Sequence, residues 1–276
     1  MRKLLYALFA LAALVCCSPE PADEHIVVDG WIEDGGFPVV MLTSSLPVWE
    51  NTWSAEDLRS HVLTLATVTV SDGENSVVLT GMKNDNYFPP YIYTTSHLRG
   101  EAGKTYSLEV KYGRTVVSAV TTIPSPQPLL EVRSELQGDG YMVYCRFTRQ
   151  PGSYYAFFSR REGKDKMYLP SFMTLVDGDA TAGGAEYDVS VMRGFDINAP
   201  EHHEDYYELG DQVSVRFCTM DRDSYEFWKG YEESWIMSHN PFFPVTSGVH
   251  SNITGGYGLW AGYGATYYDA PAAPAE

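Results

Sequence analysis

The sequence predicts a mainly β protein: an antiparallel β-sandwich of the immunoglobulin or fibronectin kind, followed by a second β-rich domain that carries one helix. Three observations support this prediction. Short runs of β-branched and aromatic residues recur about every ten residues between Gly, Asp and Asn turns, as in antiparallel sandwiches. A proline-rich segment at 124–128 interrupts the strand pattern, and one stretch near 222–237 has the helical period.

The first 24 residues are expected to be a targeting segment and a linker rather than part of the fold. Two basic residues precede an unbroken apolar stretch, Leu4–Val15, which has signal-peptide length and is too short to cross a bilayer. The segment Leu14–Ser18 then resembles the bacterial lipoprotein signal, with Cys17 as the lipid-modified residue. We expect a signal peptide over 1–16 and an acidic tether over 17–24. The alternative is an ordinary secreted signal peptide that ends in cysteines.

The composition of the tether bears on localisation. Glu20, Asp23 and Glu24 follow closely on Cys17, a pattern similar to the acidic export signal of Bacteroidetes lipoproteins. We therefore expect a lipid-anchored protein of the outer membrane that faces the cell exterior; the alternative is a solvated linker that is acidic by chance. A chain with a formal net charge of −17 is repelled by phosphate backbones, so we expect no nucleic-acid partner.

The first domain is expected over residues 25–124. Two short β-branched runs, 26–32 and 37–43, flank the turn signal at 33–36 and predict a hairpin. Further strand-like runs between turn residues lie at 62–71, 76–79, 107–112 and 116–122.

The second domain is expected over residues 128–268, after the proline-rich boundary. Its strand-like runs lie at 129–133, 141–147, 154–160, 166–169 and 213–218. Tyr225, Trp228 and Tyr231 fall near the 3.6-residue period, which predicts the helix near 222–237. The final residues, 269–276, are rich in Ala and Pro and are expected to form a disordered tail.

Few residues point to recognisable chemistry. Cys145 and Cys218 both fall in strand-like runs; an oxidising compartment would allow a disulfide between them, and two buried free thiols are the alternative. The polar segment 201–205 holds His202 and Glu204, the candidates for a metal site, and a solvated loop is the alternative. We expect no metal, no cofactor and no enzymatic activity, because no serine-hydrolase or metalloprotease motif occurs.

Aromatic residues gather in the second half of the chain. Exposed aromatic side chains stack on sugars and anchor protein interfaces, whereas buried ones form sandwich core, and both interpretations stay open. The residues that we consider for a partner surface are Tyr206, Tyr207, Tyr257, Trp260 and Tyr263.

Two motifs in the carboxyl-terminal third resemble a known family. The segment Asn240–Pro244 and the glycine-punctuated stretch Ser251–Tyr263 are similar to motifs of the Bacteroidetes lipoprotein family called domain of unknown function 4249. Residues 27–32 and 98–108 resemble two further motifs of that family. The glycines suit tight turns or close packing of a final strand better than a phosphate loop, because neither a basic residue nor a helix follows them.

The resemblance implies a role rather than a chemistry. Members of this family are typically encoded near TonB-dependent outer-membrane receptors, which implies an accessory part in uptake. We therefore expect a surface lipoprotein that is the non-catalytic binding component of a TonB-dependent uptake system. The alternatives are a structural or adhesion lipoprotein and a surface hydrolase.

Overall fold

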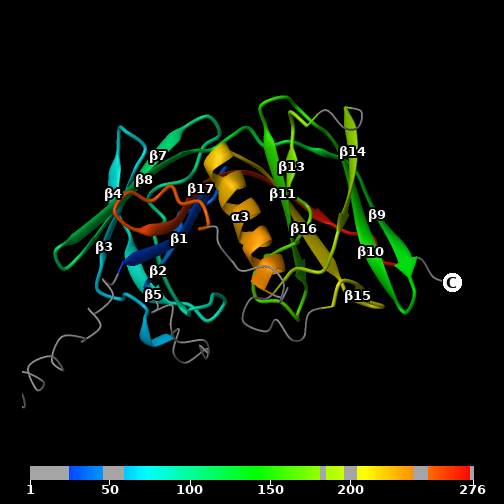
Figure 1. The fold of residues 1–276 in the computed structure, drawn as a ribbon, viewed down its shortest axis with the longest axis horizontal. Coiled ribbons are helices and arrows are strands. Elements are labelled where there is room, and N and C mark those ends of the chain that lie inside the picture. Colours follow the sequence, from blue (N-terminus) through cyan, green and yellow to red (C-terminus); the bar gives the residue numbers. More distant parts are fainter. Residues whose placement is uncertain (1–24, 46–58, 181–184, 196–203, 239–247, 274–276) are drawn as a thin grey trace, which may run out of the picture.

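The computed structural model describes residues 25–45, 59–180, 185–195, 204–238 and 248–273. Within them the protein is mainly β, as the sequence predicts, with three sheets and the helix α3, Arg222–Ser238. This confirms the helix expected near 222–237. Figure 1 shows the sheets arranged as two sandwiches side by side, with α3 between them.

The first sandwich packs half of a nine-stranded sheet against a four-stranded one. The strands from the large sheet are β1 (Ile26–Glu33), β2 (Val39–Ser44), β6 (Tyr91–Thr94) and β5 (Thr80–Lys83). The opposing strands are, in order, β4 (Ser76–Val78), β3 (Thr67–Ser71), β7 (Thr105–Tyr112) and β8 (Thr115–Thr122). Buried and exposed residues alternate along β7 and β8, so this sheet turns one apolar face to the core.

The second sandwich is built in the same way around an aromatic core. From the large sheet it takes β11 (Tyr154–Arg161), β12 (Leu169–Pro170), β13 (Val176–Asp177) and β16 (Val213–Met220). Its second sheet comprises β9 (Leu129–Gln137), β10 (Gly140–Thr148), β14 (Glu186–Val191) and β15 (Tyr207–Glu208). Between the sheets Phe157 stacks on Phe217 with ring centroids 4.7 Å apart, and Phe147 packs against both.

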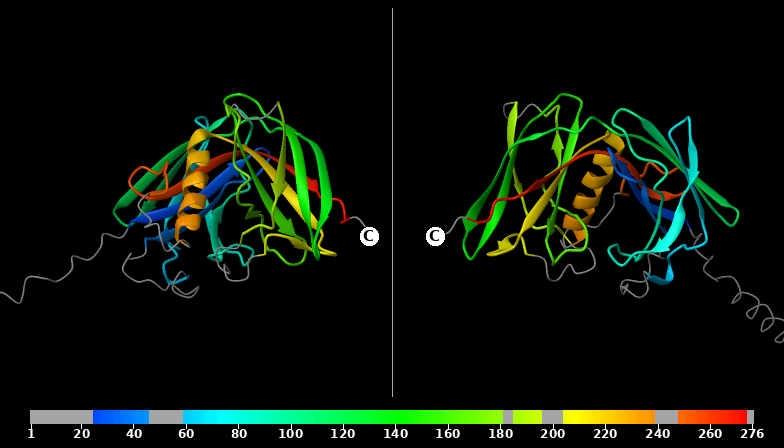
Figure 2. Two further views of the ribbon diagram at one scale, coloured as in Figure 1. Left: turned by 45° about the vertical axis from the view of Figure 1, so that its right-hand side comes forward. Right: turned by 180° about the vertical axis from the view of Figure 1, so that it is seen from behind.

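The last strand, β17 (Tyr257–Asp269), belongs to both sandwiches. Its first half pairs in parallel with β1, and its second half pairs antiparallel with β16. The large sheet therefore runs unbroken through the molecule (Figures 1 and 2). Residues 253–263, which the sequence analysis placed with the second domain, complete the first one: Ile253 and Trp260 lie in the same core cluster as Val28 and Val117.

An ion pair fixes the point at which β17 passes from one sandwich to the other. Glu33, at the end of β1, accepts hydrogen bonds from Arg216 of β16 and from the Tyr267 hydroxyl of β17, both at 2.7 Å. Arg216 is buried and lies over the rings of Phe158 and Tyr263. Each charge thus has a close partner in a place where an unpaired one would be costly.

Two glycines of β17 let its backbone pass close to neighbouring backbone. Gly258 has φ +109°, and a Cβ there would overlap the carbonyl oxygen of Val28. A Cβ at Gly262 would lie 2.7 Å from the carbonyl oxygen of Thr122 on β8. The glycine-punctuated stretch is therefore a place of backbone packing, as the sequence analysis favoured.

The end of the chain packs against the second sandwich. The Ala270 N–H donates to the carbonyl of Val213 at 2.8 Å, and Ala270 and Ala273 pack against the aromatic core. The disordered tail expected over 269–276 is therefore wrong as far as residue 273. Small side chains, which suggested disorder by composition, here fit closely against the apolar interior.

Gly262→Ala should lower the free energy of unfolding by about 1–3 kcal/mol, because the added methyl would press on the backbone of β8. Gly230→Ala, in the middle of α3, is the matched control. Its Cβ would meet only ordinary contacts of 3.5 Å or more, so the better helix former should raise stability by about 1 kcal/mol. Denaturant unfolding of both variants measures the difference, and changes of the same sign would contradict this account of the crossing.

Candidate functional site

Helix α3 is held to both sandwiches by polar contacts. Asp221, just before the helix, accepts the Ser224 N–H at 2.9 Å and thereby caps the first turn. The other oxygen of the same carboxylate accepts the Thr121 hydroxyl of β8, also at 2.9 Å. One turn further on, the Trp228 indole N–H donates to the Tyr263 hydroxyl of β17 at 2.9 Å. The helix is therefore fixed relative to the sheets along its first two turns.

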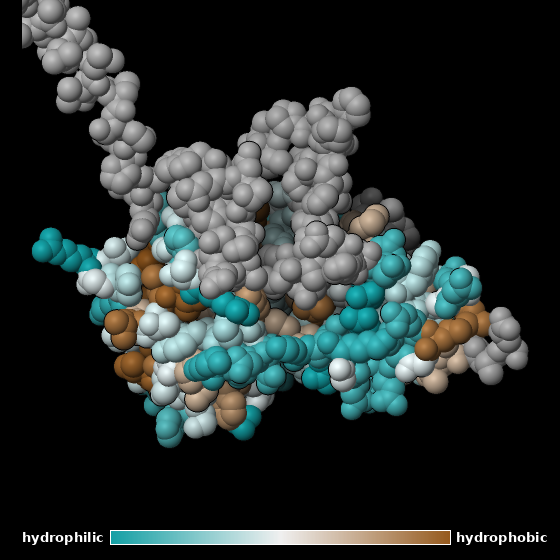
Figure 3. All heavy atoms as spheres, turned by 90° about the horizontal axis from the view of Figure 1, so that it is seen from below, coloured by the Kyte–Doolittle hydropathy of each residue, from teal (hydrophilic) through white to brown (hydrophobic). Residues whose placement is uncertain are grey.

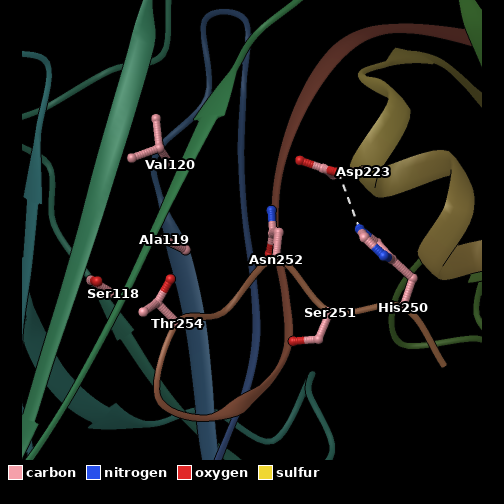
Figure 4. Close-up of a pocket in the computed structure, with 8 residues that line it drawn as sticks. All are labelled: Ser118, Ala119, Val120, Asp223, His250, Ser251, Asn252 and Thr254. Atoms are coloured by element: carbon pink, nitrogen blue, oxygen red, sulfur yellow. Dashed lines mark hydrogen bonds and ion pairs between the residues drawn. The ribbon is translucent and has the colours of Figure 1, made fainter. Parts of the chain in front are cut away.

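A hollow of about 380 Å³ opens where α3 meets β8 (Figure 4). Its lining residues are Ser118, Ala119, Val120, Asp223, His250, Ser251, Asn252 and Thr254. The imidazole of His250 points toward Asp223, with 3.1 Å between Nε2 and Oδ1, while Val120 is 58% exposed. Hydroxyl, imidazole and carboxylate groups beside two apolar side chains suit a polar, hydroxyl-bearing ligand or the polar loop of a partner protein.

Sequence reasoning missed this hollow. His250 and Asp223 are 27 residues apart in the sequence, and the packing of residues 250–254 along β8 brings them together. The nearest sequence feature was the motif at 251–263, and the structure shows that this motif packs inside the protein. Asn252 donates to the Trp260 carbonyl at 2.8 Å and accepts the Trp260 N–H at 2.9 Å, so it holds the start of β17 in place.

Only two of the five aromatic candidates for a partner surface are exposed. Tyr206 is 46% and Tyr257 53% accessible. Tyr207, Trp260 and Tyr263 are buried, so the expectation that they contribute to a surface is wrong. Successive residues of an extended chain face opposite sides, which sends Tyr206 outward and Tyr207 into the core, where its hydroxyl donates to Met192 at 2.8 Å.

The two exposed tyrosines do not form one surface. Tyr206 precedes β15 in the second sandwich, whereas Tyr257 begins β17 beside the start of β1. They are therefore separate candidates for contacts with partners.

The cysteines do not form a disulfide. Cys145 lies in the aromatic core of the second sandwich, whereas Cys218 faces the other side of the large sheet, beneath α3, and both thiols are free. The large sheet stands between them, which is why they cannot bridge. Burial raises the pKa of each thiol to about 12.

Of the two candidate metal ligands, the structure describes only Glu204. His202 lies outside the described residues, and Glu204 is exposed. Among the residues that the structure describes, no group of three or more His, Cys, Asp or Glu side chains is placed to hold a metal ion.

Two carboxyl groups on the α3 side of the large sheet have raised pKa values. Asp29 is exposed, but the protein around its carboxyl group still desolvates it in part and raises its pKa to about 6. Desolvation also raises the pKa of Glu232 on α3 to about 7. Glu232 accepts the N–H of Met173 at 3.2 Å and so helps to hold that exposed residue at φ +59°, a left-handed conformation that side chains disfavour.

These features define a protein of two β-sandwiches that share one continuous sheet, with a polar hollow beside the helix that joins them. No helix among the described residues is both long and apolar enough to cross a membrane. The chain belongs to the family described as "Domain of unknown function (DUF4249)", whose profile matches residues 18–268. This is the family that the sequence motifs resemble.

Other comparisons add little to the family assignment. No curated protein matches this sequence. A chain from a solved "Cytokine receptor complex - Crystal form 1A" is similar at 12% sequence identity, over 71% of this chain and 85% of that one. The TM-score of that comparison is 0.24, so it carries no argument about function.

Tyr207→Ser should lower the free energy of unfolding by about 3–5 kcal/mol, because it empties a fully buried aromatic site. Tyr206→Ser, one residue earlier and exposed, should change it by less than about 0.5 kcal/mol. Thermal or denaturant unfolding of the two variants makes the comparison. Equal losses would mean that the opposite orientation of the two side chains is wrong.

The free energy of unfolding should fall as the pH rises from about 4.5 to about 7. The lower value is the ordinary pKa of a glutamate, and the upper value is the pKa of Glu232 in the folded protein. The folded protein holds this proton more tightly than the unfolded chain does, so the raised pKa costs stability at higher pH. Glu232→Gln keeps an oxygen for Met173 and should add on the order of 1 kcal/mol at about pH 8 while flattening the slope.

The matched control for this pH experiment is Glu233→Gln, which removes a charge from an exposed position one residue further along α3. Unfolding is followed across the pH range for both variants. A slope that Glu232→Gln leaves unchanged would show that another group is responsible.

Proposed function

We propose that this protein is a lipid-anchored, non-catalytic binding protein of the outer membrane that serves as the accessory component of a TonB-dependent uptake system. The observation that carries the proposal is the amino terminus, where the apolar stretch Leu4–Val15 leads directly to Cys17. The family match begins at residue 18, immediately after that cysteine. This boundary supports a processed chain in which Cys17 is the first residue.

The length of the tether supports an accessory role close to the membrane. The tether 17–24 has eight residues up to His25, the first described residue, and a chain of that length spans at most about 29 Å. A lipid on Cys17 would therefore keep the first sandwich near the bilayer. Confinement to the same membrane as a receptor raises the effective concentration of both proteins, so a modest contact is enough for binding.

Two described surfaces are suited to such a contact. The hollow beside α3 presents His250, Asp223 and several hydroxyl groups, which can exchange hydrogen bonds with a polar ligand or loop. Tyr206 presents an exposed aromatic ring on the second sandwich, and exposed aromatic residues are frequent anchors at protein interfaces. Both surfaces bind without needing a catalytic group.

Cys17→Ala should release the protein from the membrane fraction or block its processing, because the acceptor for the lipid is gone. Cys16→Ala is the matched control: it puts a favoured small residue before the modified cysteine and should leave anchoring intact. Cell fractionation and mass spectrometry of the processed terminus measure both variants. A Cys17→Ala protein that stays in the membrane with its lipid would contradict the proposed lipid anchor on Cys17.

The uptake role is tested separately by purifying the wild-type lipidated protein from solubilised outer membranes and identifying its partners by mass. A TonB-dependent transporter is the expected partner, and Tyr206→Ser should lower its recovery several-fold if Tyr206 is an anchor. Recovery of no transporter by the wild type would favour a structural or adhesion lipoprotein instead.

A further inference from the structure

Several elements of the first sandwich end at one place. β17 begins at Tyr257, whose pairing partner is Val27 near the start of β1, and β3 begins at Thr67, paired with Lys111 near the end of β7. A Cβ at Gly256 would lie 2.6 Å from the Ile26 oxygen and 3.0 Å from the Val117 side chain, so the start of β8 adjoins the start of β1. Figures 1 and 2 show the β7–β8 turn and the start of β1 at the same end of the molecule.

Large apolar or aromatic side chains are exposed at this end. Leu65 is 87% accessible, Tyr257 53%, Val116 50% and Tyr112 39%. They come from different elements, so their exposure is not the outward face of a single strand. Seen from below, hydrophobic residues gather where the described chain begins, and a hydrophilic side chain projects beyond them (Figure 3). We call these four residues, with Lys111 and Arg114, the tether end.

The charge of the tether end differs from that of the chain as a whole. The protein has a formal net charge of −17, yet the β7–β8 hairpin tip carries Lys111 and Arg114. Lys111 pairs with Glu109 at 2.7 Å, whereas the exposed Arg114 makes no ion pair with any residue that the structure describes. An arginine that pairs with no described acidic residue, in a hairpin that also exposes Tyr112 and Val116, matches the phosphate and acyl groups at a bilayer surface.

We infer that the tether end is a membrane-contact surface that rests on the headgroup region of the bilayer. This inference rests on the proposed lipid anchor and adds to it the face that meets the lipid. The first described residue, His25, is at this end, its ring 5.1 Å from that of Tyr257. A tether of eight residues, 17–24, holds this end within about 29 Å of the bilayer, so these side chains can reach the lipid.

Contact at this end orients the rest of the protein. The second sandwich, with Tyr206 and Leu209, lies at the opposite end of the shared sheet and is directed away from the lipid. Lipid contact and a partner contact through Tyr206 would then use different parts of the molecule.

The test places an environment-sensitive fluorophore on the full lipidated protein, reconstituted in vesicles of phosphatidylethanolamine and phosphatidylglycerol that contain a spin-labelled quencher lipid. Leu65→Cys provides the probe at the tether end. Leu209→Cys, a leucine 59% exposed in the second sandwich, is the matched control. The native Cys145 and Cys218 are buried, so labelling is selective for the new thiol.

The Leu65 probe should shift to the blue and be quenched several-fold more than the Leu209 probe. A second probe at the exposed polar residue Thr115, where no apolar side chain is lost, should behave as the Leu65 probe does. Equal quenching at 65 and 209, or quenching at 65 without quenching at 115, overturns the inference while the anchor stands. A wild-type protein that does not float with the vesicles overturns the anchor itself, and the inference with it.

Discussion

The pairing of β17 with both β1 and β16 is the constraint on which the rest of the structure depends. It turns what would be two separate sheets into one and brings the last strand against the first. The crossing from one partner to the other falls at Tyr263, and this residue also accepts the Trp228 indole N–H of α3. The helix, the two sandwiches and the Glu33–Arg216 ion pair therefore meet within a few residues of one point.

A shared sheet also explains why the hollow can be a defined site. Its walls come from β8, the first turn of α3 and residues 250–254, which are remote from one another in the sequence. Asp221 joins two of these walls by capping α3 and accepting the Thr121 hydroxyl. A site assembled from separate elements keeps its geometry only if those elements cannot shift, and here hydrogen bonds and the continuous sheet hold them together.

Local patterns predicted local structure well. The alternation in 107–112 and 116–122 marked β7 and β8, and the spacing of Tyr225, Trp228 and Tyr231 marked α3, because each pattern reflects one buried face. Relations between distant segments could not be read in this way. The parallel pairing of Val27 with Tyr257 leaves no local signature, and only the register of β15 with β10 decides that Tyr207 rather than Tyr206 is buried. The separation of Cys145 from Cys218 likewise depends on which side of a shared sheet each one faces.

The position of β1 has a mechanical consequence. The chain that precedes it leaves from the strand's first residues, and the strand itself is flanked by β2 on one side and β17 on the other. Force applied through the amino terminus along the strand loads the hydrogen bonds on both sides in shear, all together, whereas pulling on an edge strand would peel its bonds apart one after another. A strand that is paired on both sides is therefore harder to draw out by its amino-terminal end than an edge strand such as β5.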